Sequence, residues 1–502
     1  MPDHIAVGGD GDALIHEAEL RIKADEPFLA GEHDALAPGG FRVGADLTQN
    51  TGRTAFVPMG RGGDDAEYHL PPTLRRVEMG VIVHLIGEVG HIGDEAVDES
   101  FHLAALVQQP GQTDALDPAS RGLSRYVSEY GPYPAWKNST AKYYPCGEAM
   151  YPDLLADLEK AERFIFLEFF IVRTGKMWDG VEDILVRKAA QGVDVRLIYD
   201  DFGSLLGLPS DFVVKMERAH IRCIPFNPVM PLVSLVMNHR DHRKIVVVDG
   251  NTAYTGGINL ADEYINEEER FGYWKDAALR TEGAAVWNFT VMFLDHWNAF
   301  RPSEEDYTPF MPQAESLSAQ SDGVIQPYGD SPLDEEALAE TVYLNIINQA
   351  QRYVYIYTPY FAVGETMLEA LKAAAKRGVD VRLVLPGIPD KKLVFRLTRS
   401  YYVPLLRAGV RIYEFTPGFL HAKCYVSDDR AAVVGSINMD YRSLFLHFEC
   451  GALLLYNSQV IALRDDVLRT LPECREVQLA DCRTSLAGTL LDSVLRLLSP
   501  LM

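Results

Sequence analysis

Two distant stretches of this chain repeat the same pattern of residues. Residues 242–259 read HRKIVVVDGNTAYTGGIN, and residues 421–438 read HAKCYVSDDRAAVVGSIN. Each stretch has a His-x-Lys-x4-Asp pattern and then Gly, with an Asn 17 residues after the His. The similarity continues upstream, where residues 164–171, 185–201 and 218–225 resemble residues 353–361, 370–387 and 407–415. An internal duplication of this length predicts two structural repeats, and it excludes most other arrangements of the chain.

Each half has the local signals of an α/β unit. Residues 185–201 and 370–387 both combine a helical stretch, a Gly stop and a buried strand. The order β-α-β-α-β-β in each half predicts a mixed sheet covered by helices, with the His-x-Lys strand at its centre. In the first half, the apolar run 245–248 anchors that strand, and Asp249-Gly250 supplies a turn into a second short strand at 252–256.

The His-x-Lys pairs are the candidate reactive groups. Side chains two apart on a strand share a face, so His242 projects together with Lys244, and His421 together with Lys423. A single pair is compatible with a core strand that ends in a His and an extended Lys. Two copies with the same downstream Gly and Asn indicate a reactive site, because packing alone does not require those residue types. A cation beside an imidazole suits a phosphate group.

Composition limits the function and the organisation of the chain. The net charge of −24 argues against general nucleic-acid binding, which needs a broad basic surface. Residues 1–120 hold 21 acidic and 7 basic residues and sixteen of the 39 Gly, so we expect a poorly ordered acidic extension there. The six Cys are scattered, which favours reduced thiols. The chain shows neither an 18-residue apolar run nor a signal-peptide pattern, so no transmembrane helix is expected.

The two HxKxxxxD motifs, His242/Lys244/Asp249 and His421/Lys423/Asp428, resemble those of the phospholipase D superfamily. The segments NHRDHRKIVVVDG, TGGINLADEYIN, PGIPDKK, YEFTPGFLHAK and NMDYRSLFLHFECG are similar to bacterial cardiolipin synthases. The resemblance runs from about Arg121 to Met502. It implies a phospholipase D fold, an α/β fold of two pseudo-twofold-related repeats at 121–315 and 316–502, with the site between them.

The resemblance implies phosphatidyl transfer without a cofactor or metal. One His attacks phosphorus and the other exchanges protons with the leaving and entering alcohols, while Lys244 and Lys423 bind the phosphoryl oxygens. The sequence does not decide which His is the nucleophile; superfamily analogy favours His242. The motifs are not accompanied by a His/Asp/Glu cluster with metal-ligand spacing in the sequence.

Further residues are assigned from their distance to the motifs. Asn259 and Asn438 are expected to help to bind the phosphoryl oxygens. In the family, an acidic residue about thirty positions after each His orients it, so Asp276 is matched to His242 and Glu449 to His421. The motif includes Asp249 and Asp428 among the catalytic positions. Both lie at the turn on the opposite strand face, so we expect them to cap that turn and to pair locally.

The implied reaction joins two phosphatidylglycerols into cardiolipin and glycerol, with phosphatidylglycerol and the membrane surface as partners and no nucleic acid. A phospholipase D-type hydrolase that uses water as acceptor is the alternative within the superfamily, and a silent lipid-binding scaffold is the alternative outside it. The expected location is the cytoplasmic face of the cell membrane, with peripheral attachment. Residues 390–406 are interpreted equally well as an interfacial helix and as a helix on the sheet, and the apolar residues 227–237 as core or as an acyl entry route.

Overall fold

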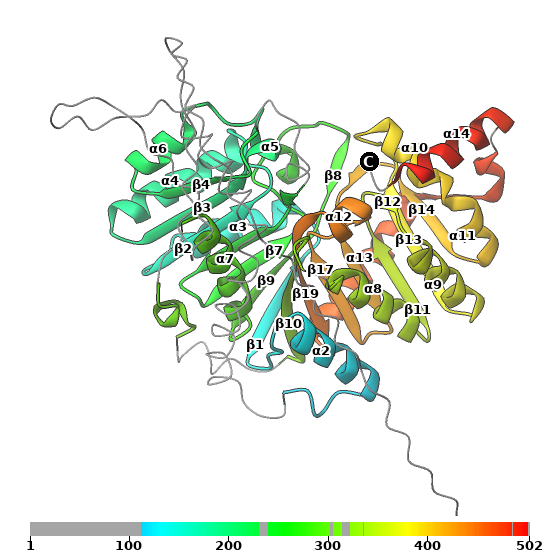
Figure 1. Ribbon diagram of the computed structural model, residues 1–502, viewed down its shortest axis with the longest axis horizontal. Helices are drawn as coiled ribbons and strands as arrows, with labels where there is room; N and C mark the ends of the chain where they lie inside the picture. Colours follow the sequence, from blue (N-terminus) through cyan, green and yellow to red (C-terminus); the bar gives the residue numbers. More distant parts are fainter. Residues whose placement is uncertain are drawn as a thin grey trace, which may run out of the picture. The chain divides into compact units, whose positions relative to one another are not determined.

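The computed structural model describes residues 112–229, 239–301, 305–313, 322–334, 336–483 and 485–499. In this part the chain forms two α/β repeats, shown in cyan to green and in yellow to red (Figure 1). The extension expected at residues 1–120 lies outside the described residues up to residue 111.

The first half of the described chain contains short strands alternating with helices. Its elements are α2 (Pro118–Tyr130), β1 (Ser139–Tyr144), α3 (Gly147–Leu158), β2 (Phe164–Phe169), α4 (Lys176–Ala190), β3 (Asp194–Asp200), α5 (Asp201–Ser204), α6 (Phe212–Arg218), β4 (Arg222–Phe226), β5 (Arg240–Asp241), β6 (Lys244–Val248), β7 (Thr252–Gly256), the 3₁₀ helix η2 (Asp262–Ile265), β8 (Tyr273–Lys275), β9 (Ala278–Gly283), α7 (Val286–Phe300) and η3 (Thr308–Phe310).

The second half repeats this order and adds further elements at its end. Its elements are β10 (Val324–Asp330), α8 (Leu338–Gln349), β11 (Tyr353–Tyr357), β12 (Phe361–Ala362), α9 (Glu365–Lys376), β13 (Asp380–Pro386), α10 (Lys392–Ser400), α11 (Tyr402–Ala408), β14 (Arg411–Phe415), β15 (Gly418–Leu420), β16 (Cys424–Ser427), β17 (Ala431–Gly435), β18 (Met439–Asp440), α12 (Tyr441–Phe445), β19 (His447–Leu455), α13 (Ser458–Thr470), η5 (Leu471–Glu473), β20 (Cys474–Glu476), η6 (Leu479–Cys482) and α14 (Leu486–Leu497).

The two sheets have matching strand orders. The first runs β1-β9-β7-β6-β2-β3-β4, and the second runs β10-β19-β17-β16-β11-β13-β14-β20. The strands β6, which begins at Lys244, and β16, which follows Lys423, each lie fourth in their sheet. Parallel pairs such as β2 with β3 adjoin antiparallel pairs such as β2 with β6. The predicted mixed sheets with a central His-x-Lys strand are therefore confirmed.

Alternating side chains on the central strands join the two repeats. On β6, Val246 and Val248 pack in a core with residues of α3 and α4, whereas Ile245 and Val247 face a second core. That second core also contains residues of α7 and of the second repeat, including Val426 of β16. Because side chains on a strand alternate between faces, each central strand contacts both its own helices and the other repeat.

Two short strands, β5 and β15, pair with strands of the opposite repeat. β5 pairs in parallel with the start of β19, where Asp241 lies opposite Phe448. β15 pairs in parallel with β8, where Leu420 lies opposite Lys275. Each segment directly precedes a motif His, so each His is positioned by backbone from the other repeat.

Residues 112–120 are part of the packed structure. Leu116 is buried, and the Asp117 side chain accepts hydrogen bonds from the first backbone N–H groups of α2 and lies 3.5 Å from Arg430. From α2, Ser124 donates to Gln326 of β10 at 2.7 Å. This helix, expected in the first repeat, therefore contacts strands of the second. The domain boundaries at 120 and 315 remain predictions.

Residues 390–406 form two short helices, α10 and α11, rather than one. Leu397 is buried, whereas Leu393 is exposed. Among the helices that the structure describes, none has both the length and the apolar character needed to cross a bilayer. Most of the apolar segment 227–237 lies outside the described residues.

Candidate active site

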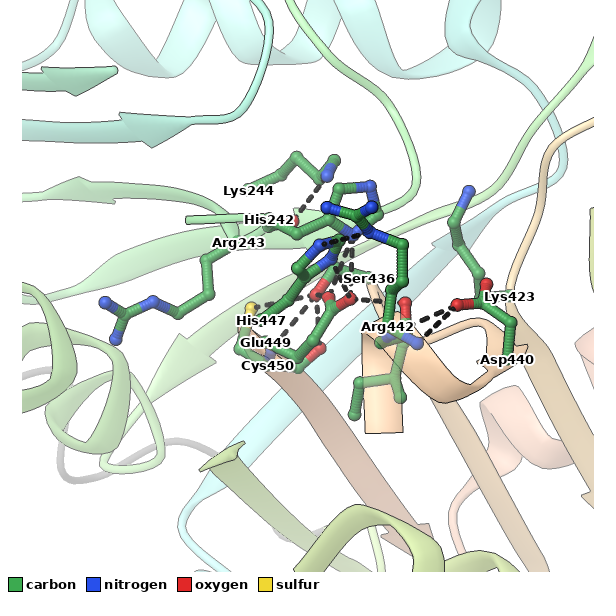
Figure 2. Close-up of polar contacts among 12 residues, drawn as sticks. His242, Arg243, Lys244, Lys423, Ser436, Asp440, Arg442, His447, Glu449 and Cys450 are labelled. Carbon is green, nitrogen blue, oxygen red and sulfur yellow. Dashed lines mark hydrogen bonds and ion pairs between the residues drawn. The ribbon is translucent and has the colours of Figure 1, made fainter. Parts of the chain in front are cut away.

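His242 is held between backbone of one repeat and a carboxylate of the other. Its N–H donates to the Phe448 carbonyl at 2.9 Å. Its Nδ1 lies 2.8 and 3.0 Å from the two carboxylate oxygens of Glu449, which is fully buried (Figure 2). Since the carboxylate accepts the Nδ1 proton, the Nε2 lone pair of the neutral imidazole is free for chemistry.

His421 has the symmetry-related environment. Its N–H donates to the Lys275 carbonyl at 2.7 Å, and its Nδ1 lies 2.8 Å from Asp276 Oδ2. Asp276 is fully buried and also accepts from the Ala277 N–H at 2.8 Å. Each imidazole is thus oriented by a buried carboxylate from the opposite repeat.

The expected matching of each carboxylate with the His of its own repeat is wrong. Asp276 contacts His421, and Glu449 contacts His242. The cause is the exchange of short strands between repeats, because β15 places His421 beside the end of β8, where Asp276 follows. β5 likewise places His242 beside Glu449 in β19.

The two carboxylates differ in electrostatics. Burial raises the pKa of Glu449 well above its usual range, against the opposing effects of Lys244 and of the Ser436 and Ser443 hydroxyls. Burial also acts to raise the pKa of Asp276, but His421 and Lys423 outweigh it, and the net pKa is lowered. Asp276 is therefore the carboxylate that better stabilises a positive charge on its imidazole.

The imidazoles and lysines influence one another across the two repeats. Burial and Lys423 lower the pKa of His421 to about 4. Burial lowers the pKa of His242 well below its usual range, with contributions from Lys244, Lys423 and His421. Burial also lowers the pKa of Lys244 to about 8 and that of Lys423 to about 7. The mutual effects place both His-x-Lys pairs and both carboxyl groups in one site, where the two lysine ammonium groups can bind an anion.

The two candidate asparagines are not equivalent. Asn259 is fully buried, accepts from the Ile171 N–H at 3.0 Å and donates to the Tyr264 hydroxyl at 2.8 Å. Asn438 is also buried, but its Oδ1 lacks a hydrogen-bond partner among the described residues. The phosphate-binding role of both stays a prediction. The Nδ2 group of Asn259 is already bonded to Tyr264, so Asn259 is the less available donor.

Comparison with known proteins identifies the family. Residues 154–275 and 343–468 match the family model described as "Cardiolipin synthase, PLD-like domain". The chain is 37% identical over 393 residues to a cardiolipin synthase of Geobacillus kaustophilus, covering 77% of each chain. This chain belongs to the cardiolipin synthase family. It is also 45% identical to an uncharacterized protein of Streptococcus mutans, over 76% of this chain and 82% of the relative.

The fold agrees with this family assignment. The crystal structure of phosphatidylserine synthase from Haemophilus influenzae superposes with a TM-score of 0.58 at 15% identity, over 76% of this chain and 100% of that one. The similarity supports the phospholipase D fold expected for a cardiolipin synthase family member.

The Asp residues of the family motif lie away from the imidazoles. Asp249 accepts from the backbone N–H groups of Glu162, Arg163 and Phe164 at 2.7–2.9 Å. Asp428 accepts in the same way from residues 351–353 at 2.7–2.9 Å. A catalytic role for either Asp is not supported by this placement, and the expectation of local pairing is wrong. Each fixes the backbone that enters β2 or β11, about eighty residues earlier in the chain.

A buried ionic cluster next to His242 was not predicted from the sequence. Arg243 contacts Glu168 at 2.8 Å and Asp241 at 3.3 Å, and His296 Nδ1 lies 2.7 Å from Glu168. A signal was present, because Glu168 is an acidic residue inside an apolar strand and therefore needs a buried partner. The cluster supports the backbone on both sides of His242.

Tertiary structure also creates clusters that the sequence did not reveal. His242, His447 and Glu449 offer ligand atoms within 4.8 Å of one another, as do Glu168, Asp241 and His296. The sequence shows no metal-ligand spacing near the motifs, and these clusters form only when distant segments come together in the fold. Lys244 or Arg243 lies beside each cluster, and these cations oppose the binding of a divalent ion. Metal independence stays a prediction for this family member.

Proposed function

We propose that this chain is a cardiolipin synthase-like phosphatidyltransferase that joins two phosphatidylglycerols into cardiolipin and glycerol. The observation that carries the proposal is the pair of buried His residues, each held by a carboxylate of the other repeat and each accompanied by a Lys. Membership in the cardiolipin synthase family supports the choice of substrate.

In the first step, one imidazole Nε2 attacks the phosphorus of the donor lipid. The bond to the terminal glycerol breaks, and the second imidazole protonates the departing oxygen, leaving a phosphohistidine. Lys244 and Lys423 neutralise the non-bridging oxygens, where negative charge concentrates in the transition state. The Asn438 amide is suited to the same task.

We infer that His242 is the nucleophile and His421 the proton carrier. A nucleophile must be unprotonated, and the pKa of His242 is strongly lowered by burial and by nearby cations. His421 contacts Asp276, whose lowered pKa keeps it ionised, so this pair better accommodates an imidazolium. A bound phosphodiester anion raises the pKa of both imidazoles toward neutrality.

In the second step, the hydroxyl of another phosphatidylglycerol attacks the phosphohistidine. His421 takes the hydroxyl proton, the phosphorus–nitrogen bond breaks, and cardiolipin leaves. A hydrolase would use the same first step with water in the second. The relatives favour transfer to lipid. Intact His and Lys residues in both motifs oppose a silent scaffold.

Product analysis tests the proposal. Purified protein with phosphatidylglycerol vesicles should release glycerol and cardiolipin in equal amounts. His242→Ala and His421→Ala should each reduce turnover by at least about 10³-fold, because both imidazoles act in one reaction. Phosphatidic acid without cardiolipin, or near-normal turnover in either variant, would overturn the proposal.

We further propose peripheral attachment to the cytoplasmic face of the cell membrane through α10 and α14. These helices are linked by Arg396 and Asp492 at 2.8 Å. Exposed Leu490, Val494 and Leu497 form a stripe on α14, and Lys391 and Lys392 are exposed at the start of α10. An apolar stripe beside cations suits an anionic lipid surface. Leu490→Asp with Leu497→Asp should weaken sedimentation with phosphatidylglycerol vesicles, and unchanged sedimentation would contradict this surface.

A further inference from the structure

Arg442 is a cation at the site with no ionic partner among the described residues. It lies on α12, is half-buried, and forms no ion pair in that part of the chain. Its Nε lies 3.4 Å from Nε2 of His447 (Figure 2), whose ring centre lies 5.7 Å from that of His242. The Asp440 carboxyl acts on this guanidinium electrostatically but forms no ion pair with it, so the guanidinium can still bind an anionic ligand.

His447 is the neighbour that positions Arg442. Since Nε2 accepts from Arg442, the proton of the neutral ring is on Nδ1, which is buried without a hydrogen-bond partner among the described residues. Nδ1 is 3.9 Å from Glu449 Oε1, too far for a hydrogen bond. The His447 ring therefore lies between Glu449 and Arg442, and its Nε2 positions the guanidinium.

Arg442 and His447 differ from the proposed phosphate-binding groups because they have no equivalent in the other repeat. The His, Lys, Asn and buried carboxylate all occur once in each repeat. Arg442, four residues after Asn438, corresponds to Glu263, four residues after Asn259. Glu263 is neutralised by Arg173 and by Arg270 at 2.9 Å.

His447 also has no histidine at the equivalent position of the first repeat. It stands two residues before Glu449, and the corresponding residue before Asp276 is Trp274. Trp274 and Tyr264 pack beside His421 with ring centres at 5.3 and 5.5 Å. Both imidazoles have aromatic neighbours, since Phe170 lies 5.0 Å from His242, but only the half around His242 also carries Arg442 and His447. Groups that occur in only one repeat fit a ligand that is itself unsymmetrical about the reacting phosphorus.

We propose that Arg442, positioned by His447, binds the phosphodiester of the acceptor lipid. This inference rests on the proposed transferase function, in which two phosphates meet in one site. Lys244 and Lys423 hold the reacting phosphoryl group. The acceptor brings a second phosphate, one glycerol away from its attacking hydroxyl, and this phosphate needs its own counter-charge. Water and free glycerol lack that phosphate, so Arg442 favours lipid acceptors over both.

Two reactions of the same enzyme test the proposal. Exchange of labelled glycerol into phosphatidylglycerol uses the phosphohistidine but an acceptor without phosphate. Cardiolipin formation from the same vesicles uses an acceptor with phosphate. Arg442→Gln should lower cardiolipin formation at subsaturating phosphatidylglycerol by at least about tenfold, as expected for a lost charge-assisted hydrogen bond. Glycerol exchange should stay within about twofold.

Further variants make the outcome decisive. Arg442→Lys should recover part of the cardiolipin rate, and His447→Phe should reproduce the selective loss with a ring of similar size. Exposed Arg407 on α11 provides the matched control, since Arg407→Gln should leave both rates unchanged. An equal loss of both reactions in Arg442→Gln and His447→Phe, or no loss in either, would overturn the proposal. Failure of the wild-type enzyme in both reactions would instead overturn the proposed function.

Discussion

Replacement of Glu449 by Gln tests the crossed arrangement of the site. Glu449 is fully buried, and three donors converge on its two oxygens: His242 Nδ1, Ser436 Oγ and Ser443 Oγ. Gln keeps the shape but presents an NH2 group in place of one oxygen. The hydroxyls can rotate to accept from that group. If instead it faces Nδ1, the imidazole must move its proton to Nε2, where the reactive lone pair is needed.

The expected cost follows from that tautomer change. In the serine protease triad, an Asn in place of the orienting Asp lowers kcat by about 10⁴ through the wrong tautomer. Because the Gln side chain in the Glu449→Gln variant would retain one acceptor oxygen, we expect a loss of about 10²–10⁴ in kcat, or about 3–5 kcal/mol in the activation barrier. The KM for phosphatidylglycerol should rise moderately as well, because the Glu449 charge helps to keep Lys244 protonated. Initial rates of cardiolipin formation measure both values, with the exposed Glu365→Gln as control.

Double-mutant cycles on the unfolding free energy test which His each carboxylate serves. His242→Ala combined with Glu449→Gln should show a coupling of about 0.5–3 kcal/mol, as should His421→Ala with Asp276→Asn. The same-repeat combinations, His242 with Asp276 and His421 with Glu449, should be additive within about 0.5 kcal/mol. Coupling within each repeat, or full activity of Glu449→Gln, would refute the arrangement.

Asp428→Ala should lower the free energy of unfolding by about 1–3 kcal/mol, because backbone N–H groups lose their acceptor. The folded variant should keep kcat within about threefold of wild type. A kcat loss of about 10³ would instead indicate a catalytic role for Asp428. The kcat/KM for phosphatidylglycerol should fall as pH rises through about 7 and 8, because Lys423 and Lys244 then lose the charge that binds phosphate; a limb that begins only above about pH 10 would contradict the lowered pKa values. A chelator should leave the rate within about twofold, and a tenfold loss restored by a divalent ion would indicate a metal at His242, His447 and Glu449.

Much of the fold could be predicted because its signals are local or repeated. The apolar run before Asp249 and the Gly stops after two helices define strands and helices within a few residues of sequence. The duplicated motif then predicts two similar sheets with His-x-Lys at the centre of each, as observed. Chemistry at His242 and His421 was inferred from the same repetition, since packing does not require two copies of a reactive pair.

The partners of these residues could not be predicted, because they depend on contacts between distant segments. His242 and Glu449 are 207 residues apart and meet only because β5 joins the other repeat. The spacing argument assigned Asp276 to the wrong His, and it gave no reason to place Arg442 beside His447.

The sequence by itself determined two repeats, their central strands and the four residues of the His-x-Lys pairs, because side-chain alternation and turn chemistry act over a few neighbouring residues. Only the tertiary structure decided which carboxylate orients which imidazole, that Asp249 and Asp428 hold backbone, and that one half of the site carries an Arg unpaired among the described residues. The physical reason is that the repeats share a core and exchange short strands, so each half of the site is completed by side chains of the other.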